Sequence, residues 1–384
     1  MLASDTPCFA AALQQQIQQI SNWQPFLTQL HWHRIASLVW PKIQPLKKHF
    51  PSHIIEAVSA EHQKCVKSAL KHVALLRIIE NLFNQHAIRY LSIKGPVLSQ
   101  QLYGHFAARF SRDLDIIVAE ADVEPAIALL CANGFCCESF DVATPCKRFA
   151  QFYLQKDTTL THPHLGATLE LHWRWDINPS IFQLDFESAW KHKTWVTIAD
   201  MQIPTLEPAL NLLYLCMHGS KSFWARLSWL TDIDRIASQD LVDWKQVAHF
   251  AKITNSERVL NYGVLLSHRL LNTPIPVFFA PADIEKPALR ALCRIGQWSN
   301  ARGDYPGPLL NRLLVLPLAT GWHYYLNWYT RFSGVHPKDI EAVNLPRALF
   351  PLYYVLSPIL WLWRFSSGQI EAENTPAPLR RSHH

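Results

Sequence analysis

Two aspartates separated by a single residue open the run 113–118 (DLDIIV), where their type and spacing suggest chemistry. The β-branched residues that follow them predict a strand. Because side chains two residues apart on a strand point to the same side, Asp113 and Asp115 present paired carboxylates on one face. Adjacent carboxylates repel each other, and Mg²⁺, which prefers hard oxygen ligands, relieves that repulsion. The pair therefore predicts a metal site.

A third carboxylate lies on a separate predicted strand, 168–173. Glu170 and His172 alternate there with apolar residues, so they share the polar face of this strand. Glu170 is a candidate third ligand, and His172 is a candidate base or a partner of the ligands. Metals held by three such carboxylates clamp the attacking and leaving oxygens of an in-line phosphoryl transfer.

A glycine turn provides the matching phosphate site. The alternating run 88–93 predicts a strand, Lys94-Gly95 follows it, and Pro96 suits the first turn of a new helix. Glycine lets the backbone approach a ligand closely, and the helix N-terminus offers free N–H groups to an anion. Lys94 adds a positive charge, so Lys94 and Gly95 are candidates for binding phosphates.

The elements that must position these residues follow from the periodicity of apolar residues. Helices are predicted over 10–20, 26–40 and 54–85, and the period then changes to that of strands at residue 88. The remaining predicted elements are a helix at 123–132, strands at 135–140 and 149–154, and helices at 209–220, 227–237, 244–251 and 257–271.

The alternation of elements predicts an α+β fold, with a small mixed sheet between helical segments. The expected boundaries are an N-terminal helical segment at 1–87, an α/β core at 88–206, a C-terminal helical domain at 207–365 and a disordered tail at 366–384.

Several motifs in this order resemble the uncharacterised nucleotidyltransferase family, which belongs to the DNA polymerase β-like nucleotidyltransferase superfamily. The resemblance extends from about residue 10 to residue 365. The residues that carry it are Lys94-Gly-Pro-Val-Leu98, Tyr103, Arg109, Asp113–Val118, Gly134-Phe135, Leu169–Trp173, His218–Trp224, Arg226–Trp229, Asp232, Pro337–Asp339, Leu345-Pro346 and Tyr353-Tyr354.

The resemblance implies transfer of a nucleoside monophosphate from an NTP to an unidentified acceptor, with release of pyrophosphate. It implies that Asp113, Asp115 and Glu170 are the catalytic residues and the ligands of Mg²⁺. Lys94, Gly95 and Arg109 would then bind the nucleotide. His218 and Lys221, three residues apart on one helix face, would line a cleft for the nucleotide or the acceptor.

The sequence departs from the superfamily pattern at the turn. Pro96 follows Gly95 where relatives carry a serine, so no hydroxyl is available there for a phosphate, and Lys94 is the expected substitute. Arg112 stands before Asp113 where many relatives have a small residue. These departures leave a second hypothesis open, namely a nucleotide- or partner-binding protein that has kept the fold without turnover.

Composition limits the classes of partner. The 384 residues carry 36 Lys and Arg against 30 Asp and Glu, and the basic residues are scattered, so nucleic acid is not indicated. The eight cysteines include no CxxC pair, and the first residues do not read as a secretory signal, so we expect a reduced, cytoplasmic protein. The acceptor, the preferred base and the oligomeric state are not readable from the sequence.

The aromatic C-terminal third allows two interpretations. The runs 313–330 and 348–363 contain no Asp, Glu, Lys or Arg, but prolines interrupt both. Two packed helices that cover the core are favoured here over attachment at a membrane surface, although Tyr and Trp prefer membrane interfaces.

Overall fold

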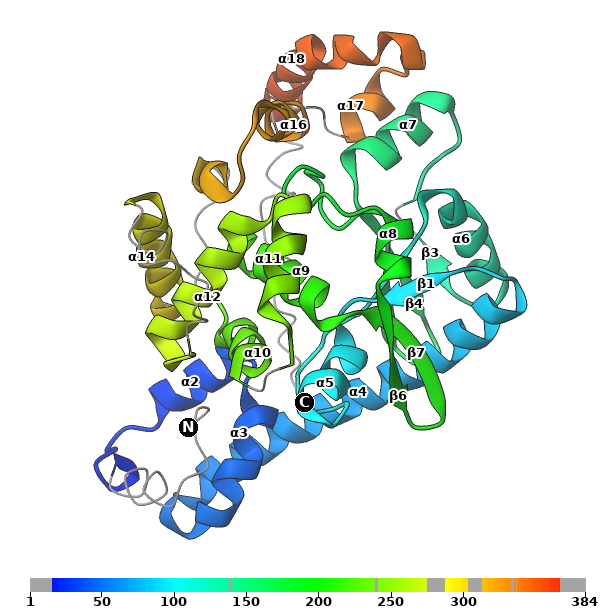
Figure 1. Ribbon diagram of the computed structural model, residues 1–384. Coiled ribbons are helices and arrows are strands. Elements are labelled where there is room, and N and C mark those ends of the chain that lie inside the picture. The colour runs from blue at the N-terminus through cyan, green and yellow to red at the C-terminus, as the bar shows by residue number, and fades with distance from the viewer. Residues whose placement is uncertain are drawn as a thin grey trace. The chain divides into compact units, whose positions relative to one another are not determined.

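The computed structural model describes residues 16–137, 140–238, 241–274, 287–302, 313–332, 335 and 337–366 (Figure 1). The expected tail from residue 367 onward lies outside these residues. The described chain divides into two compact units. Unit 1 comprises Met1–Ser139 and Lys156–Tyr324, and unit 2 comprises Phe140–Gln155 and Tyr325–His384. The domain boundaries stated above stay a prediction.

Unit 1 is built on a mixed seven-stranded sheet with the order β3-β4-β5-β2-β1-β7-β6. The strands are β1 (Tyr90–Ser92), β2 (Leu114–Val118), β3 (Cys136–Cys137), β4 (Asp157–His162), β5 (Ala167–His172), β6 (Lys193–Ile198) and β7 (Met201–Leu206). The pairs β2–β5 and β1–β7 are parallel, and the other pairs are antiparallel. This arrangement confirms the α+β class with a mixed sheet and flanking helices.

The helices of unit 1 precede the sheet, connect its strands and follow it. They are α2 (Gln24–His33), α3 (Ala36–Ile43), α4 (Ser52–Gln85), α5 (Gly95–Tyr103), α6 (Val123–Ala132), α8 (Phe186–Lys191), α9 (Pro208–Lys221), α10 (Leu227–Ser238), α11 (Trp244–Ile253), α12 (Glu257–Leu271) and α14 (Pro287–Arg302). The long helix α4 contacts α5, α6 and β5, and α9 contacts α10, α11, α12 and β7 (Figure 1).

Most elements of unit 1 agree with the sequence patterns. The predicted helices at 123–132 and 257–271 have the bounds of α6 and α12. The strand predicted at 113–118 begins one residue later, at Leu114, so Asp113 precedes the strand. The hairpin of β6 and β7 and the strand β4 have no counterpart among the predicted elements.

Unit 2 contains α7 (Pro145–Leu154), α17 (Pro337–Ala342), η4 (Arg347–Leu352) and α18 (Tyr353–Ser366), with most of α16 (Trp322–Phe332). The prediction of a strand at 149–154 is wrong, because this segment belongs to α7. Thr144 caps that helix by accepting the backbone N–H of Lys147 at 3.2 Å, and Pro145 occupies its first turn. The apolar residues of α7 pack in one core with η4 and α18. The members of this core are Cys146, Ala150, Leu154, Val335, Ile340, Phe350 and Tyr353.

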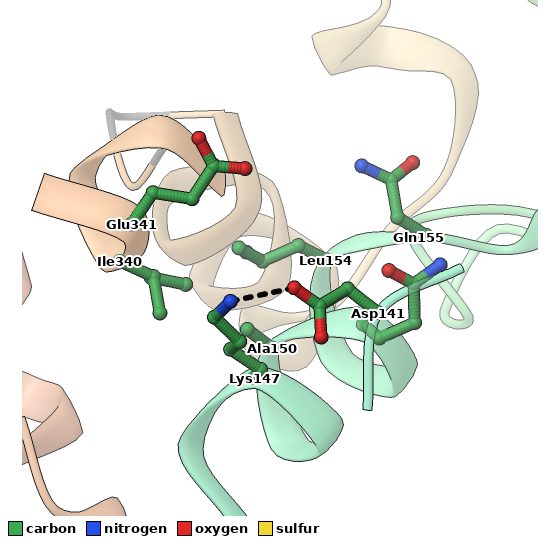
Figure 2. A pocket seen from close by; sticks show the side chains of 8 residues that line it. Asp141, Lys147, Ala150, Leu154, Gln155, Ile340 and Glu341 are labelled. Atoms are coloured by element: carbon green, nitrogen blue, oxygen red, sulfur yellow. Dashed lines mark hydrogen bonds and ion pairs between the residues drawn. The ribbon is translucent and has the colours of Figure 1, made fainter. Parts of the chain in front are cut away.

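A small hollow lies between α7 and α17, and Figure 2 shows its lining. Lys147 points across it to Asp141, with 2.6 Å between Nζ and Oδ2. Its volume is about 50 Å³, which suits a few waters rather than a substrate.

No helix among the described residues is both long enough and apolar enough to cross a lipid bilayer.

Candidate active site

Neighbouring parallel strands bring two of the predicted carboxylates together. Asp115 on β2 lies directly opposite Glu170 on β5, so both side chains leave the same face of the sheet side by side. His172 follows two residues later on that face. One ligand atom from each of Asp115, Glu170 and His172 lies within 4.8 Å of the other two. We call these three residues the carboxylate–imidazole cluster.

The imidazole of His172 connects three carboxylates. Its Nε2 lies 3.3 Å from Oδ1 of Asp115 and 3.6 Å from Oε2 of Glu170. Its Nδ1 lies 3.4 Å from Oδ2 of Asp157, the residue opposite His172 on β4. The neighbouring His172 lowers the pKa of Glu170, which outweighs the effect of burial. Asp157 was not among the predicted site residues, because the sequence patterns did not identify β4.

Asp113 lies beside the cluster rather than in it. Its Oδ2 is 3.1 Å from Nη2 of Arg112, whose side chain is 71% exposed. Burial raises the pKa of Asp113, and the charges of Asp115 and Glu170 raise it further. Asp113 therefore experiences the field of the same carboxylates. Arg112 also lies 3.9 Å from Glu170, so its guanidinium bridges the predicted third ligand and Asp113.

Lys94 forms a buried ion pair with Asp115. The distance from Nζ to Oδ1 is 2.9 Å, and the two side chains are 13% and 2% exposed. Burial alone would lower the pKa of Lys94, but the Asp115 carboxylate outweighs it and the pKa is raised. Burial would likewise raise the pKa of Asp115, but Lys94 and His172 hold it below its usual range. Asp115 is therefore ionised, and Lys94 neutralises it.

The glycine turn places Lys94 in this position. Gly95 begins α5 with φ +68°, a left-handed conformation that side chains with a Cβ seldom adopt. A Cβ at Gly95 would lie 3.5 Å from Cδ1 of Leu114 and 3.9 Å from the carbonyl oxygen of Asp113. The turn thus packs against the beginning of β2, next to the acidic residues, and its role in phosphate binding stays a prediction.

Arg109 connects the sheet region to the C-terminal helices instead of to the paired aspartates. Its Nε donates to Oδ2 of Asp232 on α10 at 2.7 Å, and both side chains are buried. The Tyr103 hydroxyl donates to the other oxygen of the same carboxylate at 2.8 Å. The residues Tyr103, Arg109 and Asp232, which carried part of the family resemblance, form one buried polar network.

α9 carries the two predicted cleft residues, and they have different environments. His218 packs between the rings of Tyr214 and Trp229, and burial holds its pKa well below the usual value. The charge of Lys94, 5.8 Å above the Tyr214 ring, lowers the pKa of His218 further. His218 is thus neutral and close to Lys94. Lys221 forms an ion pair with buried Asp176, in the loop after β5.

A groove adjoins the cluster. Its volume is about 610 Å³, within the range of small-molecule sites. Ile117, two residues past Asp115 on the same face of β2, lines it, and so does Trp173, which directly follows His172. Asp176, the partner of Lys221, lies in the same lining. The lining contains none of the three cluster residues, but it includes residues at the ends of β2 and β5 and the partner of Lys221.

Comparison with known proteins gives one match. The family model described as "Uncharacterised nucleotidyltransferase" matches residues 20–272, which include every residue of the site described above. No curated protein and no solved structure shows a significant match.

Proposed function

The chain belongs to the uncharacterised nucleotidyltransferase family, and on that basis we propose that it transfers a nucleoside monophosphate from an NTP to an acceptor. An acceptor oxygen attacks the α-phosphorus, the bond from this phosphorus to the bridging oxygen breaks, and pyrophosphate leaves with the electron pair. The observation that supports this proposal is the carboxylate–imidazole cluster on adjacent parallel strands, next to a lysine at a helix N-terminus.

The donor set suits a hard divalent cation. Carboxylate oxygens from Asp115 and Glu170 meet within coordination range, and Asp113 adds a third carboxylate beside them. Nδ1 of buried His172 lies 3.4 Å from Oδ2 of Asp157, so Nε2 is the ring atom that faces the carboxylates of Asp115 and Glu170. These oxygens match the preference of Mg²⁺. When bound, the cation neutralises charge on the phosphoryl oxygens of the transferred group.

The residues of the chain have distinct proposed roles. Asp113, Asp115 and Glu170 hold the cation, and Glu170 with His172 is placed to accept the proton of the attacking hydroxyl. Lys94 and the α5 N-terminus at Gly95 receive the triphosphate, where a preorganised positive charge stabilises the transition state. The groove beginning at Ile117 and Trp173 receives the acceptor. Arg109 is a positioning residue, because its Nε is committed to Asp232.

Pyrophosphate release tests this proposal. Purified protein is incubated with each NTP and Mg²⁺, with a cell extract as the source of acceptor. Glu170→Gln is the most informative variant, because this side chain is 24% exposed, whereas Asp115 is 2% exposed and paired with Lys94. We expect it to lower the rate by about 10² to 10⁴-fold, the usual contribution of such a group. Asp200→Asn, an exposed carboxylate paired with Arg77, is the matched control.

Full transfer activity in Glu170→Gln, or in an Asp113→Asn/Glu170→Gln double variant with normal thermal stability, contradicts the proposed site. Loss of activity in Asp200→Asn as well would mean that the assay reports stability rather than catalysis.

One observation favours a second candidate function, a nucleotide-binding protein without turnover. Lys94, which the turn geometry would offer to a phosphate, is engaged by Asp115 in this structure. Calorimetry with each NTP separates the two: binding without pyrophosphate or labelled product under any acceptor condition favours the binding protein.

A further inference from the structure

α18 is apolar on both of its sides, although only one side is packed. On its inner side Tyr353 is fully buried, and the Ser357 hydroxyl donates to Oδ2 of Asp339 at 2.7 Å. The exposed side carries Val355, Ile359 and Leu362, which are 68%, 60% and 59% exposed. Leu352, one residue before the helix, is 46% exposed and continues the same row.

The spacing of these residues makes one continuous stripe. Positions 352, 355, 359 and 362 follow each other at intervals of three, four and three, so they lie above one another along the helix. A surface helix of a soluble protein normally presents polar residues on its outer side. An exposed apolar face of this kind marks a site of interaction with another apolar surface.

Charge identifies the class of that surface. The segment 342–370 contains two arginines, Arg347 and Arg364, and no acidic residue. Without the tail that begins at residue 367, unit 2 consists of residues 140–155 and 325–366. These residues include six Lys or Arg and three Asp or Glu. Arg347, five residues before Leu352, is exposed, and so is Lys338 on α17. An apolar stripe without carboxylates, flanked by basic side chains, complements an anionic lipid surface.

We propose that the outer face of α18 binds the surface of an anionic lipid bilayer, with Leu352, Val355, Ile359 and Leu362 inserted at the boundary between headgroups and acyl chains. The packing of α18 within unit 2, against α17, η4 and the apolar face of α7, accounts only for its inner side. The inference is independent of the proposed transferase activity, because no residue of the active site contributes to it.

Vesicle flotation of the full-length protein tests the inference. The probes are vesicles of phosphatidylcholine alone and of phosphatidylcholine mixed with phosphatidylglycerol. The test variants are Val355→Glu/Ile359→Glu and Val355→Ser/Ile359→Ser. The matched control is Leu70→Glu/Ile253→Glu, which alters two residues that are 52% and 56% exposed on α4 and α11. Circular dichroism and thermal denaturation verify that each variant is folded.

We expect the wild type and the control to float with the anionic vesicles, at least about tenfold better than with the neutral ones. The glutamate variant should lose more than tenfold of this binding, and the serine variant a smaller amount, because burial of each large aliphatic side chain contributes about one decade.

Three results would overturn the inference. Wild-type protein that does not float with either vesicle has no lipid affinity. Equal flotation of all variants means that another surface is responsible. Size-exclusion chromatography with light scattering tests whether a second copy of the chain covers the outer face of α18. If the wild type does not float but forms a dimer that the α18 variants dissociate, this face binds a second copy.

Discussion

Nζ of Lys94 lies 2.9 Å from Oδ1 of Asp115, and the pair is buried at the junction of a helix N-terminus and a strand. The ammonium thereby engages one of the two carboxylate oxygens of Asp115, a candidate metal ligand. Coordination of a cation through Oδ1 of Asp115 would weaken its ion pair with Lys94 and make the ammonium available to a phosphate. We therefore expect the metal and the triphosphate to bind cooperatively.

The Lys94–Asp115 pair makes a prediction for stability. Asp115→Asn leaves the buried ammonium without its partner and should lower the free energy of unfolding by about 3–5 kcal/mol. The double variant Lys94→Met/Asp115→Asn should recover much of this loss, because no buried charge is left uncompensated. Urea denaturation of both single variants and the double variant measures the coupling. Additive effects would mean that the two side chains do not interact.

Substitution of Gly95 by alanine should affect both backbone strain and NTP binding, and a control glycine separates the two effects. Gly95→Ala forces a Cβ into a left-handed conformation and should cost about 1–2 kcal/mol of stability. Gly104 is the matched control, because its φ is +70° and a Cβ there meets no atom within 4 Å. Both variants should lose similar stability in thermal denaturation. Only Gly95→Ala should weaken NTP binding in calorimetry, and equal weakening in both would remove Gly95 from the proposed phosphate site.

The Arg109–Asp232 pair predicts a structural role for both residues. Arg109→Met removes the partner of a buried carboxylate, and the free energy of unfolding should fall by about 3–5 kcal/mol. Tyr103→Phe removes one hydrogen bond to the same carboxylate and should cost about 1–3 kcal/mol. Denaturation curves test both values. An Arg109→Met variant that keeps its stability but no longer binds NTP would instead make Arg109 a direct nucleotide ligand.

The buried imidazole of His33 should make the free energy of unfolding depend on pH. Its Nδ1 accepts the backbone N–H of Leu227 at 3.0 Å, and burial, followed by the charge of Arg226, lowers its pKa to about 4. The unfolded chain, with a His pKa near 6.5, binds this proton more readily. Stability is therefore complete above about pH 6.5 and falls as the pH decreases toward 4, by up to about 3 kcal/mol.

Urea midpoints of wild type and His33→Asn across this range measure the effect of that proton. The substituted protein should be less stable at neutral pH and should show a smaller loss between pH 6.5 and pH 4. Parallel curves for the two proteins would mean that other groups govern the acid sensitivity.

The sequence identified some of the residues that meet at the candidate site and missed others. Asp115, Glu170 and Lys94 come together as their alternation and the glycine turn indicated, because strand periodicity and turn chemistry are local properties. The contribution of Asp157 depends on the pairing of β4 with β5, which no local pattern specifies. The partner of Arg109 is Asp232, 123 residues away in sequence, so its assignment required the packing of α10.

The prediction of a strand at 149–154 is wrong for a related reason. Aromatic and β-favouring residues such as Phe149, Phe152 and Tyr153 have strand propensity, but Thr144 and Pro145 provide a helix start just before them. Tertiary packing in unit 2 then decides the outcome, since Cys146, Ala150 and Leu154 lie on one helical face against η4 and α18. The motif at 218–224 shows the same dependence: Gly219 is required because the indole ring of Trp224 packs directly against its Cα.

The shared core of α7 and the C-terminal helices has a consequence for synthesis of the chain. α7 ends at Leu154, and its first partner in that core, Val335, follows after 180 further residues. At a translation rate of about 5–20 residues per second, α7 leaves the ribosome roughly 10 to 40 s before its apolar face can be covered. During that interval α7, which connects β3 to β4, exposes the apolar face that Val335, Ile340, Phe350 and Tyr353 later cover.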